Sequence, residues 1–132
     1  MKLKKVLCGV LCGVLIAGTS SVALVEAATT DSVSGRCGNT GVVGSANIAR
    51  HSASAYTTQS GNSGSVTVDS SCKYRDVSAG KTRSLTRKKT ATVSASTSFT
   101  VYEEDYMKTL NSTHSASLGN YTWSGNTTSV SY

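Results

Sequence analysis

The sequence lacks proline altogether and has only one tryptophan and one phenylalanine among its 132 residues. So few large side chains exclude a thick hydrophobic core. Disordered chains are typically rich in proline and poor in β-branched residues, whereas this chain has no proline and many threonines and valines. From Ala28 onward, 38 residues are serine or threonine. We therefore expect an ordered, thin β-structure.

The N-terminus has the three parts of a secretory signal peptide. Lys2, Lys4 and Lys5 precede an apolar run over residues 6–17, which ends too early for a membrane span of roughly 20 residues. Small residues before position 28 predict cleavage after Ala27. We expect residues 1–27 to be removed and residues 28–132 to form a single secreted β domain, extracellular and with the cell surface as a candidate location.

The predicted mature chain is mildly basic and has two cysteines. Removal of the signal peptide leaves ten basic and six acidic side chains, a net charge near +4. An exported chain with two thiols commonly pairs them, so the sequence predicts a disulfide between Cys37 and Cys72. The alternative is two buried free thiols.

Three patterns define the expected fold. Small apolar residues alternate with hydroxyl residues over 90–102, which predicts one long antiparallel strand with a polar face. The segment 51–62 (HSASAYTTQSGN) is repeated at 114–126 (HSASLGNYTWSGN), and both copies are interpreted as β-hairpins. Acidic residues followed by Lys108 suggest a short helical turn near 103–110. The expected fold class is all-β, a small antiparallel β-sandwich with duplicated hairpins.

The sequence favours no catalytic or cofactor-dependent function. Ser78 to Thr82 resembles the end of a phosphate-binding loop, but Arg75 stands where the first glycine is required, so no nucleotide is expected. His51 and His114 have no cysteine or acid nearby in the sequence, so neither a metal nor another cofactor is predicted. No nucleophile-elbow motif is present. We expect a protein that is not an enzyme.

A cluster of basic residues within 17 positions is the principal binding candidate. Its members are Lys73, Arg75, Lys81, Arg83, Arg87, Lys88 and Lys89. If residues 81–89 are extended, Lys81, Arg83, Arg87 and Lys89 share one face and form a positive stripe that could follow an anionic polymer. Aromatic stacking platforms are scarce in this segment, which disfavours nucleic acid and favours an anionic envelope polymer or membrane surface. The alternative is a solvated edge strand whose charge prevents aggregation.

Aromatic residues in the repeated segments form a second candidate. The residues are Tyr56, Tyr121, Trp123 and Tyr132. They could make an exposed patch for sugars or a partner, or they could supply the core of a chain that has few other large side chains.

The C-terminal segment HSASLGNYTWSGN, together with the terminal Tyr132, resembles secreted bacteriocins of the lactococcin 972 type. The resemblance covers about 20 residues and implies a small exported β-sandwich. A Cys37–Cys72 pair is not part of that family's pattern, so no functional residue is carried over.

Three functions follow from these observations. The first is a non-catalytic β-sandwich that binds an anionic envelope component at the cell surface. The second is a secreted bacteriocin-like antibacterial protein. The third is a self-assembling extracellular matrix protein, which the uncharged alternating segment 90–102 would favour.

Overall fold

Eight strands make up the part of the chain that the computed structural model describes, residues 29–130. The predicted signal peptide, its cleavage point and Tyr132 lie outside these residues. The strands are β1 (Thr29–Cys37), β2 (Thr40–Ile48), β3 (Ser52–Gln59), β4 (Ser65–Asp76), β5 (Lys81–Ala91), β6 (Ser94–Thr100), β7 (Tyr106–Leu118) and β8 (Tyr121–Val130).

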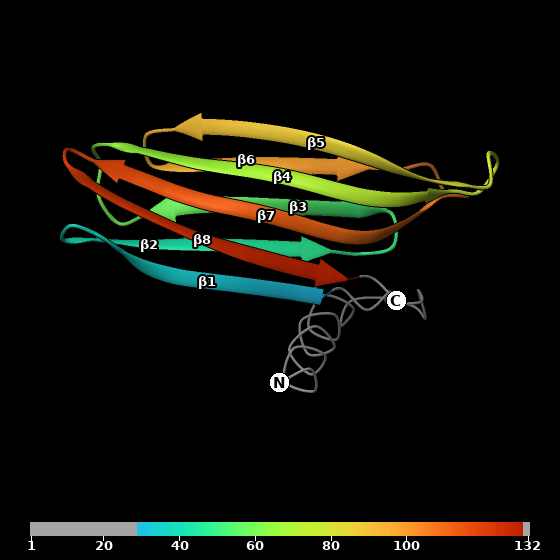
Figure 1. Cartoon of the computed structure of the whole chain (residues 1–132), viewed down its shortest axis with the longest axis horizontal. Coiled ribbons are helices and arrows are strands. Elements are labelled where there is room, and N and C mark those ends of the chain that lie inside the picture. The colour runs from blue at the N-terminus through green and yellow to red at the C-terminus, as the bar shows by residue number, and fades with distance from the viewer. Residues whose placement is uncertain (1–28, 131–132) are drawn as a thin grey trace, which may run out of the picture.

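The strands form two antiparallel four-stranded sheets that pack face to face (Figure 1). Sheet A has the order β1-β2-β3-β6, and sheet B has the order β5-β4-β7-β8. Tight turns join the hairpins β1–β2, β2–β3, β4–β5 and β7–β8, while the chain crosses between the sheets after β3, β5 and β6. The predicted all-β antiparallel sandwich is confirmed.

Burial alternates along the strands because successive side chains point to opposite faces of a sheet. The inner faces form one core with few large members, among which Phe99, Ile48, Met107 and Leu110 are the largest fully buried hydrophobic side chains. Small residues such as Ala46 and Ala55 fill much of the rest, so the core is thin, as the composition suggests.

The alternating segment 90–102 is not one strand. β5 ends at Ala91 in sheet B, and β6 begins at Ser94 in sheet A, so the chain changes sheet at Thr92 and Val93. Phe99 is buried as expected, whereas Val93 is exposed at the crossing. A period of two persists through the crossing because both strands alternate, and alternation alone cannot reveal a change of sheet.

The two sequence repeats do not form equivalent hairpins. The copy over 51–62 contains β3 and a bend that leads into β4 of the other sheet, so it is a crossing. The copy over 114–126 contains the β7–β8 hairpin, whose turn lies at Gly119 and Asn120. Gly119 has a φ of 58°, a left-handed conformation that suits glycine in such a turn. Gly119 and Asn120, which the first copy lacks, are therefore the turn of this hairpin.

The predicted helical turn near 103–110 is also absent from the described residues. Glu103 and Glu104 form a turn, and the chain from Tyr106 onward is already β7. A shift in the β4–β7 register at Lys73 and Tyr74 gives β7 an extra residue. This bulge allows Met107 and Leu110 both to point into the core.

The predicted disulfide is not formed, because the fold places the two cysteines far apart. Cys37 and Cys72 are free and fully buried. The Cys37 thiol donates to the carbonyl oxygen of Tyr121 at 3.3 Å, at the turn end of β7, where Tyr121 pairs with Leu118. Cys72 pairs instead with Leu110. That offset along β7 is about 26 Å, whereas the Cα atoms of a disulfide lie within about 7 Å of each other.

Glycines in sheet A make room for large side chains from sheet B. A Cβ atom on Gly44 would lie 2.2 Å from Cγ of His114, and one on Gly35 would lie 1.9 Å from Nε1 of Trp123. Gly41 lies on the same strand as Gly44, and a Cβ atom there would meet nothing closer than 3.6 Å. The sheets can approach because glycine occupies the positions beneath these two rings.

We expect Gly44→Ala to destabilise the domain by about 1–3 kcal/mol, because the added methyl group overpacks the ring of His114. Urea denaturation of the two alanine variants measures this effect. Gly41→Ala is the matched control and should unfold close to the wild type. Equal stability of both variants would show that the ring contact at Gly44 is not constraining.

We expect the folded domain to resist alkylation at both cysteines. Burial excludes the reagent from both thiols, and it raises the pKa of the Cys72 thiol to about 11, so little thiolate forms there. Mass spectrometry after iodoacetamide treatment should show no rapid modification of the native protein and two modified thiols in urea. A protein that stays unmodified in urea until a reductant is added would restore the disulfide interpretation.

Candidate functional site

The basic residues of the chain concentrate on β5, the edge strand of sheet B. Ten of its eleven residues are exposed, and only Ala91 is half-buried. Pairing with β4 sets the direction of each side chain: Arg87 lies opposite Ser70 and Lys89 lies opposite Val68, and both partners are buried on the inner face. The inner side of β5 therefore carries Lys81, Arg83, Leu85, Arg87, Lys89 and Ala91.

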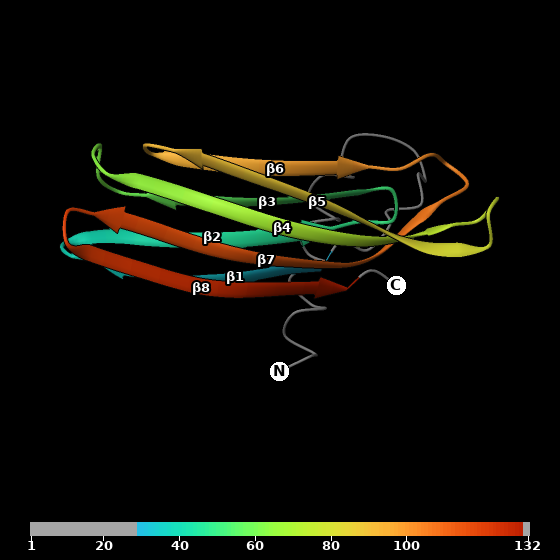
Figure 2. The same ribbon diagram turned by 45° about the horizontal axis from the view of Figure 1, so that its top comes forward.

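These inner-side cations project past the sandwich where β5 lies beside β6. Figures 1 and 2 both show the two strands together along one long edge of the molecule. The guanidinium of Arg87 lies over the ring of Phe99 on β6, with Cζ 5.6 Å from the ring centroid. We name this edge, with Lys81, Arg83, Arg87 and Lys89, the cationic edge. The expected common face of these four residues is present.

The other three predicted basic residues point elsewhere. Lys73 and Arg75 alternate with the inward-facing residues of β4, and Lys88 alternates with the inner-side cations of β5. All three therefore lie on the outer face of sheet B, where the Lys88 amine is 3.9 Å from the carboxylate of Asp69. The seven residues that the sequence groups together belong to two separate surfaces.

Ion pairing leaves most of the cationic edge available. Nε of Arg83 donates to Asp76 at 2.6 Å. The backbone amide of Ala79, the hydroxyl of Ser78 and the Arg83 side chain lower the pKa of Asp76. Within residues 29–130, no carboxylate lies within 4.0 Å of the other three cations of the edge, which are Lys81, Arg87 and Lys89.

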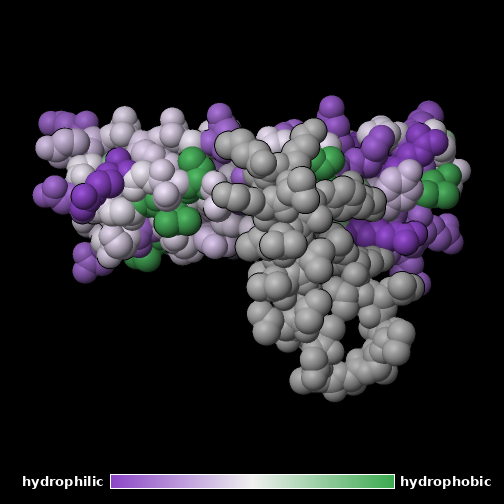
Figure 3. Space-filling model, turned by 90° about the horizontal axis from the view of Figure 1, so that it is seen from below, coloured by the Kyte–Doolittle hydropathy of each residue, from purple (hydrophilic) through white to green (hydrophobic). Residues whose placement is uncertain are grey.

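The opposite long edge of the sandwich is closed by hydrogen bonds between the sheets. The backbone amide of Thr128 on β8 donates to the Asp31 carboxylate of β1 at 2.9 Å, and the Thr29 hydroxyl donates to the Val130 carbonyl. Figure 3 views the molecule from the side of β1 and β8, where hydrophobic residues appear only as a few separate patches outside the grey atoms. The two edges therefore differ: one is sealed, and the other displays cations.

The described aromatic candidates do not form one patch. Tyr56 is 44% exposed on the outer face of β3 in sheet A. Tyr121 and Trp123 lie at the turn end of β8, where Tyr121 is next to Gly38 of the β1–β2 turn and Trp123 is next to Gly35 of β1. Trp123 packs against the core, while Tyr121 is 62% exposed. Sheet packing therefore uses two of these rings and separates them from the third.

The histidines have different surroundings despite their equivalent places in the repeat. His51 is half-buried immediately before β3, and its Nδ1 lies 2.9 Å from the carbonyl oxygen of Asp105. His114 is fully buried in the middle of β7. Within residues 29–130, no group of three or more His, Cys, Asp or Glu residues is arranged to hold a metal.

The same part of the chain contains no helix long and apolar enough to cross a membrane.

His114 joins the two sheets through a hydrogen-bond chain that sequence reasoning did not find. The Thr57 hydroxyl donates to the carbonyl oxygen of Thr67 at 3.0 Å, so its oxygen accepts a hydrogen bond from Nδ1–H of His114 at 2.8 Å. Nε2 of His114 lies 2.8 Å from the Thr127 hydroxyl, from which a neutral imidazole accepts a hydrogen bond. The only signal in the sequence is a histidine at an inward position of an alternating strand.

Burial lowers the pKa of His114, and this effect exceeds the opposing effects of the Tyr56 backbone and the Asp31 carboxylate. A lowered folded-state pKa means that the unfolded state binds the proton first as the pH falls. Stability from this residue is therefore complete above the ordinary pKa of 6.5 and is lost progressively below it, until the pH reaches the lowered value.

We expect the free energy of unfolding of the wild type to fall by up to about 1.4 kcal/mol per pH unit below pH 6.5 because of His114. Urea denaturation of wild type and His114→Gln between neutral and mildly acidic pH isolates this effect. The variant should lose that part of the slope, whereas the control His51→Gln should keep it. An unchanged slope in His114→Gln would contradict the assignment.

No protein-family model matches this chain, and neither the curated proteins nor the solved structures contain a significant match to it. The cationic edge and the surfaces beside it are therefore the features from which we infer a function.

Proposed function

We propose that the mature domain is a secreted, non-catalytic binding protein that holds an anionic polymer of the bacterial envelope along its cationic edge. The observation that carries this proposal is the position of four exposed cations on the same side of one edge strand. Alternate residues of an antiparallel strand are about 6.8 Å apart, so the charges from Lys81 to Lys89 extend over about 27 Å. A linear array of this kind suits a linear chain of phosphate or carboxylate groups.

The position of the array also supports a polymer as ligand. The cations overhang β6 at the side of the sandwich, so an extended chain could lie along the strand direction and contact each cation in turn. Such contacts weaken as salt rises, because binding releases ions condensed on the polymer. The ion pair of Arg83 with Asp76 places the strongest attraction around Arg87 and Lys89.

The same geometry weighs against self-assembly as the main function. β6 is an edge strand of sheet A and has no charged residue, so its own composition would permit edge-to-edge pairing with a second copy. The adjacent cations of β5 would, however, meet those of a second copy at the same edge, and like charges would oppose the contact. An antibacterial protein would share the attraction to the envelope and differ in its effect on the cell.

The test compares two variants with equal changes in net charge. The edge variant carries Lys81→Gln, Arg87→Gln and Lys89→Gln, and the matched control carries Lys73→Gln, Arg75→Gln and Lys88→Gln on the outer face of sheet B. The assay measures adsorption of the purified domain to bacterial cells and to immobilised polyphosphate, at low and high salt. We expect the wild type to adsorb at low salt only.

The edge variant should bind at least tenfold more weakly, and the control should retain most of its binding. Equal losses in both variants would show attraction by net charge alone, and no adsorption by the wild type would refute the proposal. Colony counts of the treated cells separate the antibacterial alternative, because loss of viability is not expected of a binder.

A further inference from the structure

Asparagine and threonine side chains alternate in a square on the outer face of sheet B. Asn111 pairs with Thr128 across β7 and β8, and Thr113 pairs with Asn126 in the next outward row. Each threonine hydroxyl donates to the amide oxygen of the asparagine opposite, both at 3.0 Å. The amide oxygens are thereby engaged, and the amide NH₂ groups are held in place with their protons available to a ligand. We name these four residues the Asn–Thr square.

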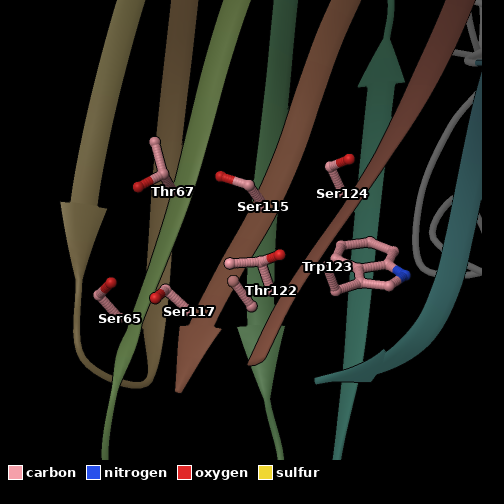
Figure 4. Close-up of a pocket in the computed structure, with 8 residues that line it drawn as sticks. Ser65, Thr67, Ser115, Ser117, Thr122, Trp123 and Ser124 are labelled. Carbon is pink, nitrogen blue, oxygen red and sulfur yellow. The ribbon is translucent and has the colours of Figure 1, made fainter. Parts of the chain in front are cut away.

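The Asn–Thr square lines a shallow depression of about 420 Å³. Asp69 and Ser71 of β4 form its other side, so carboxylate and hydroxyl acceptors lie near the amide donors. A second depression of about 320 Å³ follows along the same strands toward the β7–β8 turn. Figure 4 shows its hydroxyl residues, with Thr67, Ser115 and Ser124 in one row across three strands. Together the depressions form a polar track along the strand direction.

The charge of this track indicates the kind of ligand. β8 has no charged residue, and Asp69 lies near the Lys88 amine, so the two charges offset each other. The central rows also lack large apolar side chains, whereas Tyr56 and Val43 stand exposed in the middle of the outer face of sheet A. This composition does not suit a protein partner. Specific protein interfaces are usually centred on apolar or aromatic contacts, which the central rows do not offer.

We propose that the polar track on the outer face of sheet B binds a neutral polysaccharide chain. Each sugar hydroxyl both donates and accepts a hydrogen bond, which matches a surface of amide donors and hydroxyl or carboxylate acceptors. The cross-strand bonds hold the amides in place before the ligand arrives, which reduces the entropy lost on binding. This site is separate from the cationic edge and carries the proposal independently. The two surfaces adjoin at β5, so one envelope polymer with sugar and anionic parts could contact both.

The test uses co-sedimentation of the purified domain with chitin, cellulose and cross-linked dextran, all of which are uncharged or nearly so. We expect at least one of them to retain the wild type equally at low and high salt. The double variant Asn111→Leu with Asn126→Leu should bind at least fivefold more weakly, because leucine keeps the shape but removes the amide groups. The matched control is Asn47→Leu in sheet A, where Thr30 makes a similar but longer bond of 3.5 Å.

A second variant distinguishes loss of binding from loss of folding. Ser71→Tyr leaves the core untouched and fills the depression beside the Asn–Thr square, so it should also abolish retention while circular dichroism stays native. No retention of the wild type by any of the three polysaccharides, or full retention of both folded variants, would overturn the proposal. Retention should persist in the edge variant with Lys81, Arg87 and Lys89 replaced, so this site and the cationic edge can fail separately.

Discussion

The close approach of two sheets with small inner side chains is the constraint on which the rest of the structure depends. The rings of His114 and Trp123 occupy space above Gly44 and Gly35 of the opposite sheet, where even a Cβ atom would not fit. A chain with so few large apolar residues can exclude water only if its layers lie close together. The glycines allow this approach, and they place the few large rings where they can bridge the layers.

Polar side chains complete the core. The Ser70 hydroxyl lies 2.8 Å from that of Thr97 across the sheets and 2.9 Å from that of Ser112 on the neighbouring strand. His114 bonds to threonines of both sheets in the same way. Buried hydroxyl groups are tolerated because they are hydrogen-bonded, and such bonds also specify how the sheets are aligned. Alignment by hydrogen bonds suits a core whose small apolar residues provide little shape specificity.

The same packing gives the two long edges opposite characters. Asp31 and Thr29 bond to the backbone of β8 and close one edge. At the other edge, sheet A does not cover the inward side chains of β5, which stay exposed. Long cations with flexible stems therefore occupy these inward positions. Arg87 covers Phe99 while its charged group stays accessible. The cationic edge is therefore both a cover for the core and a candidate binding surface.

Local sequence patterns account for much of the fold and for part of the candidate sites. Alternation of apolar and hydroxyl residues determined that the chain forms strands, and the spacing of Lys81, Arg83, Arg87 and Lys89 determined that they share one side of a strand. These properties depend only on the period of two in an extended chain.

Only the tertiary structure decided which strands are neighbours and which face each residue shares with another strand. It divided segment 90–102 between two sheets, separated Cys37 from Cys72, and split the basic cluster between an edge and an outer face. It also brought Asn111 and Asn126 beside Thr128 and Thr113 in one square. Pairing and crossing depend on contacts between residues far apart in the chain, and a pattern with a period of two is the same whichever sheet its strand joins.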